Sequence, residues 1–326
     1  MHARQSVNYA LRKRGRDDGL MVTVEHWSVF RRGRDGGNPC PVVTGAAGLR
    51  PAQMLAIADH YRHESVFVTG VSAAGARLRY FVPKHEMRMC VHATIAAITA
   101  LLGSGAVPGG ETTVHTASGE HRVSWGDGDP REVTVEQQRP SFGAPIFAGD
   151  DAMATLGLPG ESLAAVAPIR VVSVSRPKLI VPVDDAAAVH AARPDFPALW
   201  ELCRQVNATG AYVFAPHPDG RRDHFVARQF PVDAGYPEDS GTGVAAAALA
   251  AYLADGLLPF EPAWARITID QGDAMGRPSR LRAAALAGPT GITRTSVTGQ
   301  AVRTGREHLD LGALLPHHDL PEPELR

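Results

Sequence analysis

Four side chains of this 326-residue chain are of types that can move protons, and they stand in short polar clusters beside apolar segments. Glu64 precedes the apolar run 65–70. Cys90 and His92 open an alanine-rich segment, and Asp239 precedes a second one. A carboxyl group partly removed from water has a raised pKa, which suits it to take a proton from carbon near neutral pH. These residue types therefore indicate acid–base chemistry.

Each of these residues also has a simpler structural explanation. A glutamate between a helix and a strand is usually a solvated surface residue, and a lone cysteine is usually a small buried apolar one. Asp239, Ser240 and Thr242 are residue types that cap helices. His60 and His63 have a three-residue spacing compatible with metal ligation, but no further ligand is recognisable nearby, so we expect no metal site.

The two alanine-rich segments are predicted to be buried helices. Residues 91–102 and 244–258 carry aliphatic side chains at helical spacing, are apolar nearly all round, and run into glycines at Gly103 and Gly256. A helix N-terminus offers unpaired N–H groups and partial positive charge to an anion. Two such ends that meet in a cleft would hold a carboxylate, which points to a small carboxylate-bearing substrate.

The remaining pattern predicts an α/β chain of two similar halves, each with one central helix. Alternating or β-branched runs predict strands at 21–30, 65–70, 77–83, 170–183, 211–216 and 265–272, and apolar periodicity predicts helices at 51–62 and 196–206. The Gly- and Pro-rich stretch 141–160 is the expected crossover. We expect residues 1–20 to be a disordered basic extension, 21–140 the N-terminal half, 141–310 the C-terminal half, with its last strands free to return to the first half, and 311–326 a tail.

Composition excludes several classes of function. The net charge of −1 gives no electrostatic reason to bind nucleic acid or an anionic membrane, and no apolar run approaches the length of a membrane span. Three cysteines without C-x-x-C spacing, and no apolar leader in residues 1–20, favour a reducing cytoplasm. No glycine-rich nucleotide loop and no G-x-S-x-G elbow occurs, so neither a nucleotide cofactor nor a serine hydrolase is supported.

Five short motifs, in the same order along the chain, resemble those of the phenazine-biosynthesis PhzF-like family. Together they span roughly residues 21–282. They are Gly37-Asn38-Pro39 for G-N-P; His63 to Val68 for H-E-S-V-F-V; Phe81, Pro83 and Glu86 leading to Cys90-Val91-His92-Ala93-Thr94 for the G-H-A-T motif; Glu238 to Val244 for E-D-P-x-T-G-S; and Gln271-Gly272 with Gly276 to Ser279 for Q-G-x-x-x-G-R-P-S.

The resemblance implies the fold shared by diaminopimelate epimerase, proline racemase and PhzF. Each half is then a mixed, barrel-like sheet wrapped around its central helix, and the active site lies between the halves. It also implies a cofactor-free isomerase, in a homodimer, in which Glu64 shuttles a proton and His92 and Asp239 assist. The residues it places around the substrate are Asn38, Val91, Ser240, Gly241, Thr242, Gly243 and Val244.

Departures from the family pattern leave three hypotheses open. Val91 stands where the family has glycine, and would be strained if that position needs positive φ. Ser240 replaces a proline and Val244 a serine. Proline racemases use a cysteine at both helix-leading motifs; Cys90 falls on the first and Ser240 on the second. The chain is therefore a Glu64-dependent isomerase, a Cys90-dependent epimerase, racemase or dehydratase, or a non-catalytic binding protein that keeps the fold.

Overall fold

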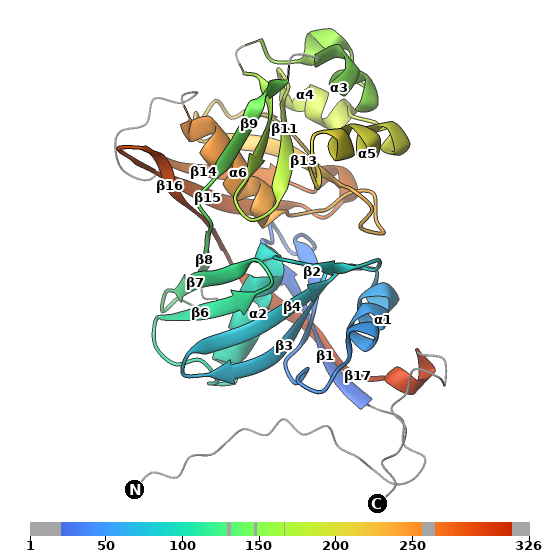
Figure 1. Cartoon of the computed structure of the whole chain (residues 1–326), viewed down its shortest axis with the longest axis vertical. Coiled ribbons are helices and arrows are strands. Elements are labelled where there is room, and N and C mark those ends of the chain that lie inside the picture. The colour runs from blue at the N-terminus through green and yellow to red at the C-terminus, as the bar shows by residue number, and fades with distance from the viewer. Residues whose placement is uncertain (1–20, 129–131, 147–148, 166, 256–264, 315–326) are drawn as a thin grey trace, which may run out of the picture.

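Two apolar helices form the centres of the two halves of the molecule (Figure 1). The computed structural model describes residues 21–128, 132–146, 149–165, 167–255 and 265–314. Helix α2 spans Val91–Gly103 and α6 spans Gly243–Ala254, and nearly every residue of both is buried. Alanine favours the helix and its small side chain lets strands pack close on every side. Both buried helices are confirmed, while the expected end of the second at Gly256 lies outside the described residues.

In the first half, strands wrap around α2 in the spatial order β17, β1, β2, β3, β4, β6, β7, β8 and β16. The pairs β2–β3 and β4–β6 are parallel and the others antiparallel, so the sheet is mixed. The bounds are β1 (Met21–Val29), β2 (Asn38–Val43), β3 (Ser65–Ser72), β4 (Gly75–Phe81), β5 (Glu86–Met87), β6 (Glu111–Thr116), β7 (Gly119–Trp125) and β8 (Val133–Gln137).

In the second half, β9 to β16 follow one another as neighbours, with α6 against β10, β11, β14, β15 and β16. The pairs β11–β12 and β13–β14 are parallel. The bounds are β9 (Ser141–Ile146), β10 (Ile169–Ser173), β11 (Pro177–Pro182), β12 (Gly210–Pro216), β13 (His224–Pro231), β14 (Ala265–Gln271), β15 (Ser279–Gly288) and β16 (Gly291–Gly299).

Two parts of this half differ from the sequence prediction. The expected crossover 141–160 begins with a strand, β9, which pairs with β10, and continues into a short helix, α3 (Gly149–Thr155). The expected single strand 170–183 is two antiparallel strands, β10 and β11, joined by a turn at 174–176. That turn matters for the site, because it carries two basic residues to the centre of the molecule.

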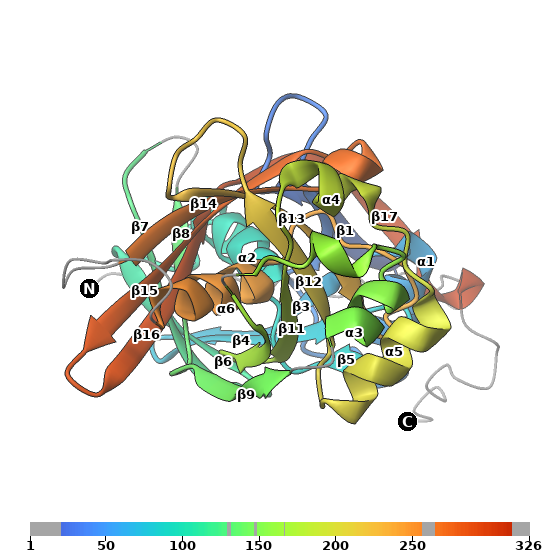
Figure 2. The same cartoon turned by 90° about the horizontal axis from the view of Figure 1, so that it is seen from above.

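The two halves share strands and a core. Strand β16 pairs with β15 in the second half and with β8 in the first, and β17 (Ala301–Asp310) returns to pair with β1. The largest apolar cluster contains residues of both α2 and α6. Helix α1 (Pro51–Tyr61) covers the first half, whereas α3, α4 (Ala186–Ala191) and α5 (Phe196–Gln205) lie together on one side of the second (Figures 1 and 2). Three single 3-10 turns complete the described elements: η1 (Gly160–Ser162), η2 (Asp273–Met275) and η3 (Leu311–Ala313).

None of the helices in the described ranges is long and apolar enough to cross a bilayer.

Candidate active site

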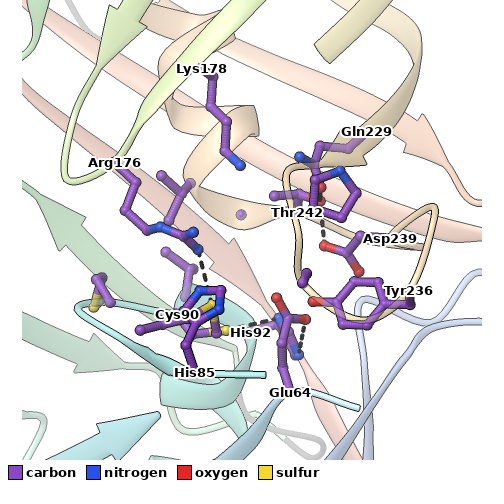
Figure 3. Close-up of a pocket in the computed structure, with 17 residues that line it drawn as sticks. Glu64, His85, Cys90, His92, Arg176, Lys178, Gln229, Tyr236, Asp239 and Thr242 are labelled. Carbon is purple, nitrogen blue, oxygen red and sulfur yellow. Dashed lines mark hydrogen bonds and ion pairs between the residues drawn. The ribbon is translucent and has the colours of Figure 1, made fainter. Parts of the chain in front are cut away.

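The N-termini of α2 and α6 meet at a pocket between the two halves (Figure 3). A Cβ atom placed on Gly243 would lie 2.6 Å from Cβ of Val91, so the first residues of the two helices are in direct contact. Val91 is a helical residue and is not among those with positive φ, so the strain expected from its β-branched side chain is absent. Valine fits here because its partner at the other helix end is a glycine.

Glu64 points into this pocket from the junction of α1 and β3. Arg62 adopts the left-handed conformation, with φ of 57°, and ends the helix, and β3 begins at Ser65. The Glu64 side chain is only 11% exposed, so the usual surface explanation for such a glutamate does not apply. Burial, followed by the nearby charge of Asp239, raises the pKa of Glu64 from 4.5 to about 8, although a hydrogen bond from Tyr236 opposes the shift.

His92 lies between Glu64 and Cys90. Its Nε2 atom makes no hydrogen bond and lies 3.4 Å from Oε2 of Glu64, whereas Nδ1 lies 3.2 Å from Sγ of Cys90. Burial lowers the pKa of His92 to about 4, so the ring is neutral at neutral pH. Burial also raises the pKa of the Cys90 thiol well above its usual value, so Cys90 keeps its proton and donates it to Nδ1. Because Nδ1 accepts this hydrogen bond, the single ring proton of neutral His92 is on Nε2, which faces Glu64.

Asp239 is fixed by donors from three elements. Asn38 Nδ2 donates to its Oδ1 at 2.7 Å, and the Thr242 hydroxyl donates to Oδ2. Gln271 Nε2 donates to the Asp239 backbone carbonyl at 2.7 Å. Asn38 also donates to the Gly241 carbonyl at 3.0 Å, so the two hydrogens of its amide group hold the loop before α6. Asn38 therefore acts on Asp239, and does not itself line the pocket.

The predicted substrate-binding residues divide into two groups. Val91, Thr242, Gly243 and Val244 line the pocket beside the catalytic candidates. Asn38, Ser240 and Gly241 stand behind it, and the Ser240 hydroxyl donates to the Gly37 carbonyl at 3.3 Å. Ser240 thus contacts backbone and does not face Cys90 across the pocket. The structure brings together Glu64, Cys90, His92 and Asp239, as the sequence motifs predicted.

Comparisons with known proteins identify the family and the fold. The family model of the phenazine biosynthesis-like protein, PhzC-PhzF, matches residues 27–306. The chain belongs to this family. An uncharacterized isomerase of Deinococcus radiodurans is 33% identical over 251 residues, which are 75% of this chain and 80% of that protein. The uncharacterized isomerase YddE of Salmonella typhimurium is 29% identical over 289 residues, 86% of this chain and 95% of its own length.

Solved structures confirm the predicted fold for this PhzF-family chain. The Bacillus anthracis phenazine biosynthesis protein of the PhzF family superposes with a TM-score of 0.81 at 23% identity, covering 89% of this chain and 99% of its own. A probable proline racemase from Agrobacterium radiobacter has a TM-score of 0.62 at 13% identity, with 88% and 92% covered. This chain therefore shares its fold with proteins whose sequences are only 13 to 23% identical to it.

Several pocket residues of this family member were missed from the sequence. Arg176 and Lys178 enter from the turn and first residues of β11, and Gln229 from β13. A lysine in the otherwise apolar run 177–183 was the available signal, since lysine is almost never fully buried without a reason. Tyr236 and His85 lie in loops and carry no such signal. The other lining residues missed are Met87, Met89, Pro231 and Ala234.

Two groups in the described residues bring three potential metal ligands within 4.8 Å of one another. In the first, Cys90 and Glu64 approach opposite nitrogens of His92, which is the order of a proton-transfer chain and a poor geometry for three ligands on one ion. The second comprises His217, His224 and Asp270. There, Arg280 Nε and Nη2 already donate to the Asp270 carboxylate at 2.7 and 2.8 Å, and these positive charges oppose a cation.

The pocket is nearly closed. Its cavity measures about 20 Å³, which is room for about one water molecule. Ligand pockets for small molecules are usually some hundreds of Å³. A substrate is larger than this cavity, so the pocket must widen before one can bind.

Proposed function

We propose that this protein is a cofactor-independent isomerase that moves a proton on a small carboxylate or amino-acid-derived substrate, in secondary-metabolite biosynthesis. The family and its isomerase-named relatives support the reaction class. The observation that carries the proposal is the buried Glu64 carboxyl, with a pKa near 8, beside the meeting ends of α2 and α6.

In this proposal the substrate carboxylate binds the free N–H groups at the two helix ends, where the helix dipoles favour negative charge. Glu64 then removes a proton from the neighbouring carbon. At pH 7, roughly one-tenth of a group with this pKa is ionised, and its proton affinity is matched to a reaction that both removes and returns a proton. The same carboxyl can then deliver the proton to another carbon on the same face of the substrate.

His92 and Asp239 support this step in different ways. The Nε2–H of neutral His92 faces Glu64 and can stabilise its carboxylate form or orient the substrate. Asp239 is ordered by Asn38 and Thr242 and presents negative charge to a substrate amine.

The alternative base, Cys90, is less suited to the task. Its thiol is buried, its pKa is raised well above the usual value, and its nearest polar neighbour is Nδ1 of a neutral histidine. A thiolate forms readily beside a cationic partner, whereas the nearby charges of Glu64 and Asp239 raise the pKa of Cys90 and oppose its ionisation. We therefore propose that Cys90 is a positioning residue that sets the tautomer of His92.

The test is deuterium incorporation from D₂O into a panel of L- and D-amino acids, 4-hydroxyprolines and aminocyclohexadiene carboxylates, followed by mass spectrometry. Glu64→Gln should lower the exchange rate by about 10²- to 10⁴-fold, the usual contribution of a general acid–base group. Cys90→Ser keeps a donor for His92 and should lose less than about tenfold, which corresponds to one hydrogen bond. Exchange that survives in Glu64→Gln and disappears in Cys90→Ser would reverse the two assignments.

A further inference from the structure

Two basic side chains reach the pocket from the wall that faces Glu64. Arg176 ends the turn before β11 and Lys178 is the second residue of that strand, and both side chains line the pocket. Figure 3 shows the Lys178 amine directed into the pocket from above, with Arg176 beside it and Glu64 below. Lys178 is only 2% exposed, and the mechanism proposed above uses neither residue.

Neither cation has an acidic partner in the described part of the chain. Lys178 makes no hydrogen bond and no ion pair within 4.0 Å there, and the one polar contact of the Arg176 side chain is with Sδ of Met87, at 3.0 Å. Arg228, which is also buried, at 7% exposure, shows the contrast. Its guanidinium donates to both carboxylate oxygens of Glu238, at 2.9 and 2.8 Å, and to the Ala192 carbonyl at 2.8 Å.

An unpaired buried cation is costly, because burial removes its hydration without supplying an opposite charge. Burial, followed by the charge of Arg176, lowers the pKa of Lys178 to about 7, although Asp239 and Glu64 oppose the shift. This wall of the pocket therefore holds two basic side chains, Arg176 and Lys178, without an acidic partner in the described part of the chain, and an anion bound between them would neutralise them. A ligand anion would restore the pairing that Arg228 obtains from Glu238.

The substrate carboxylate proposed to bind the two helix ends does not also pair with Arg176 and Lys178. Its two oxygens can be satisfied by the free N–H groups at the starts of α2 and α6. We propose that Arg176 and Lys178 form a second anion subsite, so that the substrate is a small dicarboxylate or an amino acid with an acidic side chain. The inference rests on the proposed function for the placement of the first carboxylate, and adds the chemical class of the substrate.

Glutarate and pentanoate provide a matched pair of probes, since both have five carbons and differ in one carboxylate. Binding of each is measured by isothermal titration calorimetry at pH 7 and low ionic strength. The wild-type protein should bind glutarate at least tenfold more tightly than pentanoate. Lys178→Met and Arg176→Met should each remove most of that preference, while Arg204→Met, which deletes an exposed arginine of α5 paired with Glu201, should retain it.

Equal affinities for the two probes, no measurable binding of glutarate, or a preference that survives in both Lys178→Met and Arg176→Met would overturn the subsite. Thermal unfolding of each variant verifies that it is folded before its affinity is interpreted. The readout is separate from that of the proposed function. Deuterium exchange in Glu64→Gln tests the proton transfer, whereas the glutarate preference in Lys178→Met tests the subsite, so either can fail alone.

Discussion

At the scale of single residues, the site depends on groups whose burial is unfavourable for stability. Glu64 is held by a tight turn at Arg62, and desolvation keeps its carboxyl largely protonated at neutral pH. The same environment that prepares this group for proton transfer makes its ionised form expensive in the folded state. The cost is measurable as a pH dependence of stability.

Replacement of Glu64 by glutamine should stabilise the protein increasingly as pH rises from about 4.5 to about 8. In this window the unfolded chain releases the Glu64 proton while the folded protein retains it, so wild-type stability falls with pH. The gain for Glu64→Gln should reach a few kcal/mol, at about 1.4 kcal/mol per unit of pKa difference, and level off above pH 8.

Chemical denaturation of both proteins at pH 5, 6.5, 8 and 9 measures this difference directly. Titrating groups remote from Glu64 act on both proteins alike and cancel in the comparison, and a Lys178→Met background removes the pocket lysine whose pKa the Glu64 charge influences. Glu201→Gln on the exposed face of α5 is the matched control and should give a pH-independent difference. A constant difference for Glu64→Gln would show that Glu64 is not desolvated in solution.

At the scale of secondary-structure elements, the site depends on how closely two helix ends approach. Gly243 has no room for a side chain, because its partner across the gap is Val91. The pair explains why valine is tolerated at a motif position where the family has glycine. Of the two residues in contact, the small one, Gly243, begins α6 and the larger one, Val91, begins α2.

Gly243→Ala should therefore push the helix ends apart. The added methyl would lie 2.6 Å from Cβ of Val91, and overpacking of this type costs about 1 to 3 kcal/mol. We expect lower stability by denaturation and a loss of deuterium exchange of tenfold or more. In the double variant with Val91→Gly the clash is gone, so most of both losses should be recovered. Independent, additive effects of the two substitutions would contradict a direct contact.

The elements that sequence periodicity could identify are those with a strong local pattern. Both alanine-rich helices are apolar over nearly their whole length, and polar clusters mark their starts, so the starts of α2 and α6 could be placed almost to the residue. Cys90, His92 and Asp239 followed from motifs attached to those helices, and Glu64 from the motif at the start of the strand 65–70. Strand β9 was missed because Gly143 and Pro145 give it a loop-like composition, and its pairing with β10 is a tertiary effect.

Lys178 and Tyr236 show a second limit on predicting site residues from sequence. Their approach to Glu64 depends on a turn and a loop of the second half folding over the first, and no local pattern specifies which loop will do so. Val91 shows a third limit. A substitution that looks unfavourable at one motif is accommodated by a residue about 150 positions away, and only the contact itself reveals it.

At the scale of the whole molecule, the two halves are joined firmly on one side of the pocket and weakly on the other. On the firm side, backbone N–H groups of Arg32 and Gly37 both donate to the Pro278 carbonyl at 3.0 Å, close to the strands that the halves share. On the weak side, the contacts are an exposed ion pair of Lys84 and Asp233 at 2.7 Å, a hydrogen bond of 3.4 Å from Arg62 Nη2 to the Gly235 carbonyl, and packing of Gly235 on Pro83. Exposed ion pairs of this kind contribute little to stability. This pair adjoins His85 and Ala234 at the pocket, so we expect the molecule to open there.

Covalent closure of that side should therefore block access to the site. A Lys84→Cys, Asp233→Cys variant, joined through a short bis-methanethiosulfonate that forms a disulfide with each thiol and releases methanesulfinate, should lose deuterium exchange and recover it when the linker is reduced. The native cysteines are buried, so the reagent is directed to the introduced pair. The control is Glu201→Cys, Arg204→Cys, an exposed pair within α5, which should keep its activity when linked. Because the closed cavity of about 20 Å³ has room for about one water molecule, unimpaired exchange in the linked protein would mean that substrate reaches Glu64 by another route.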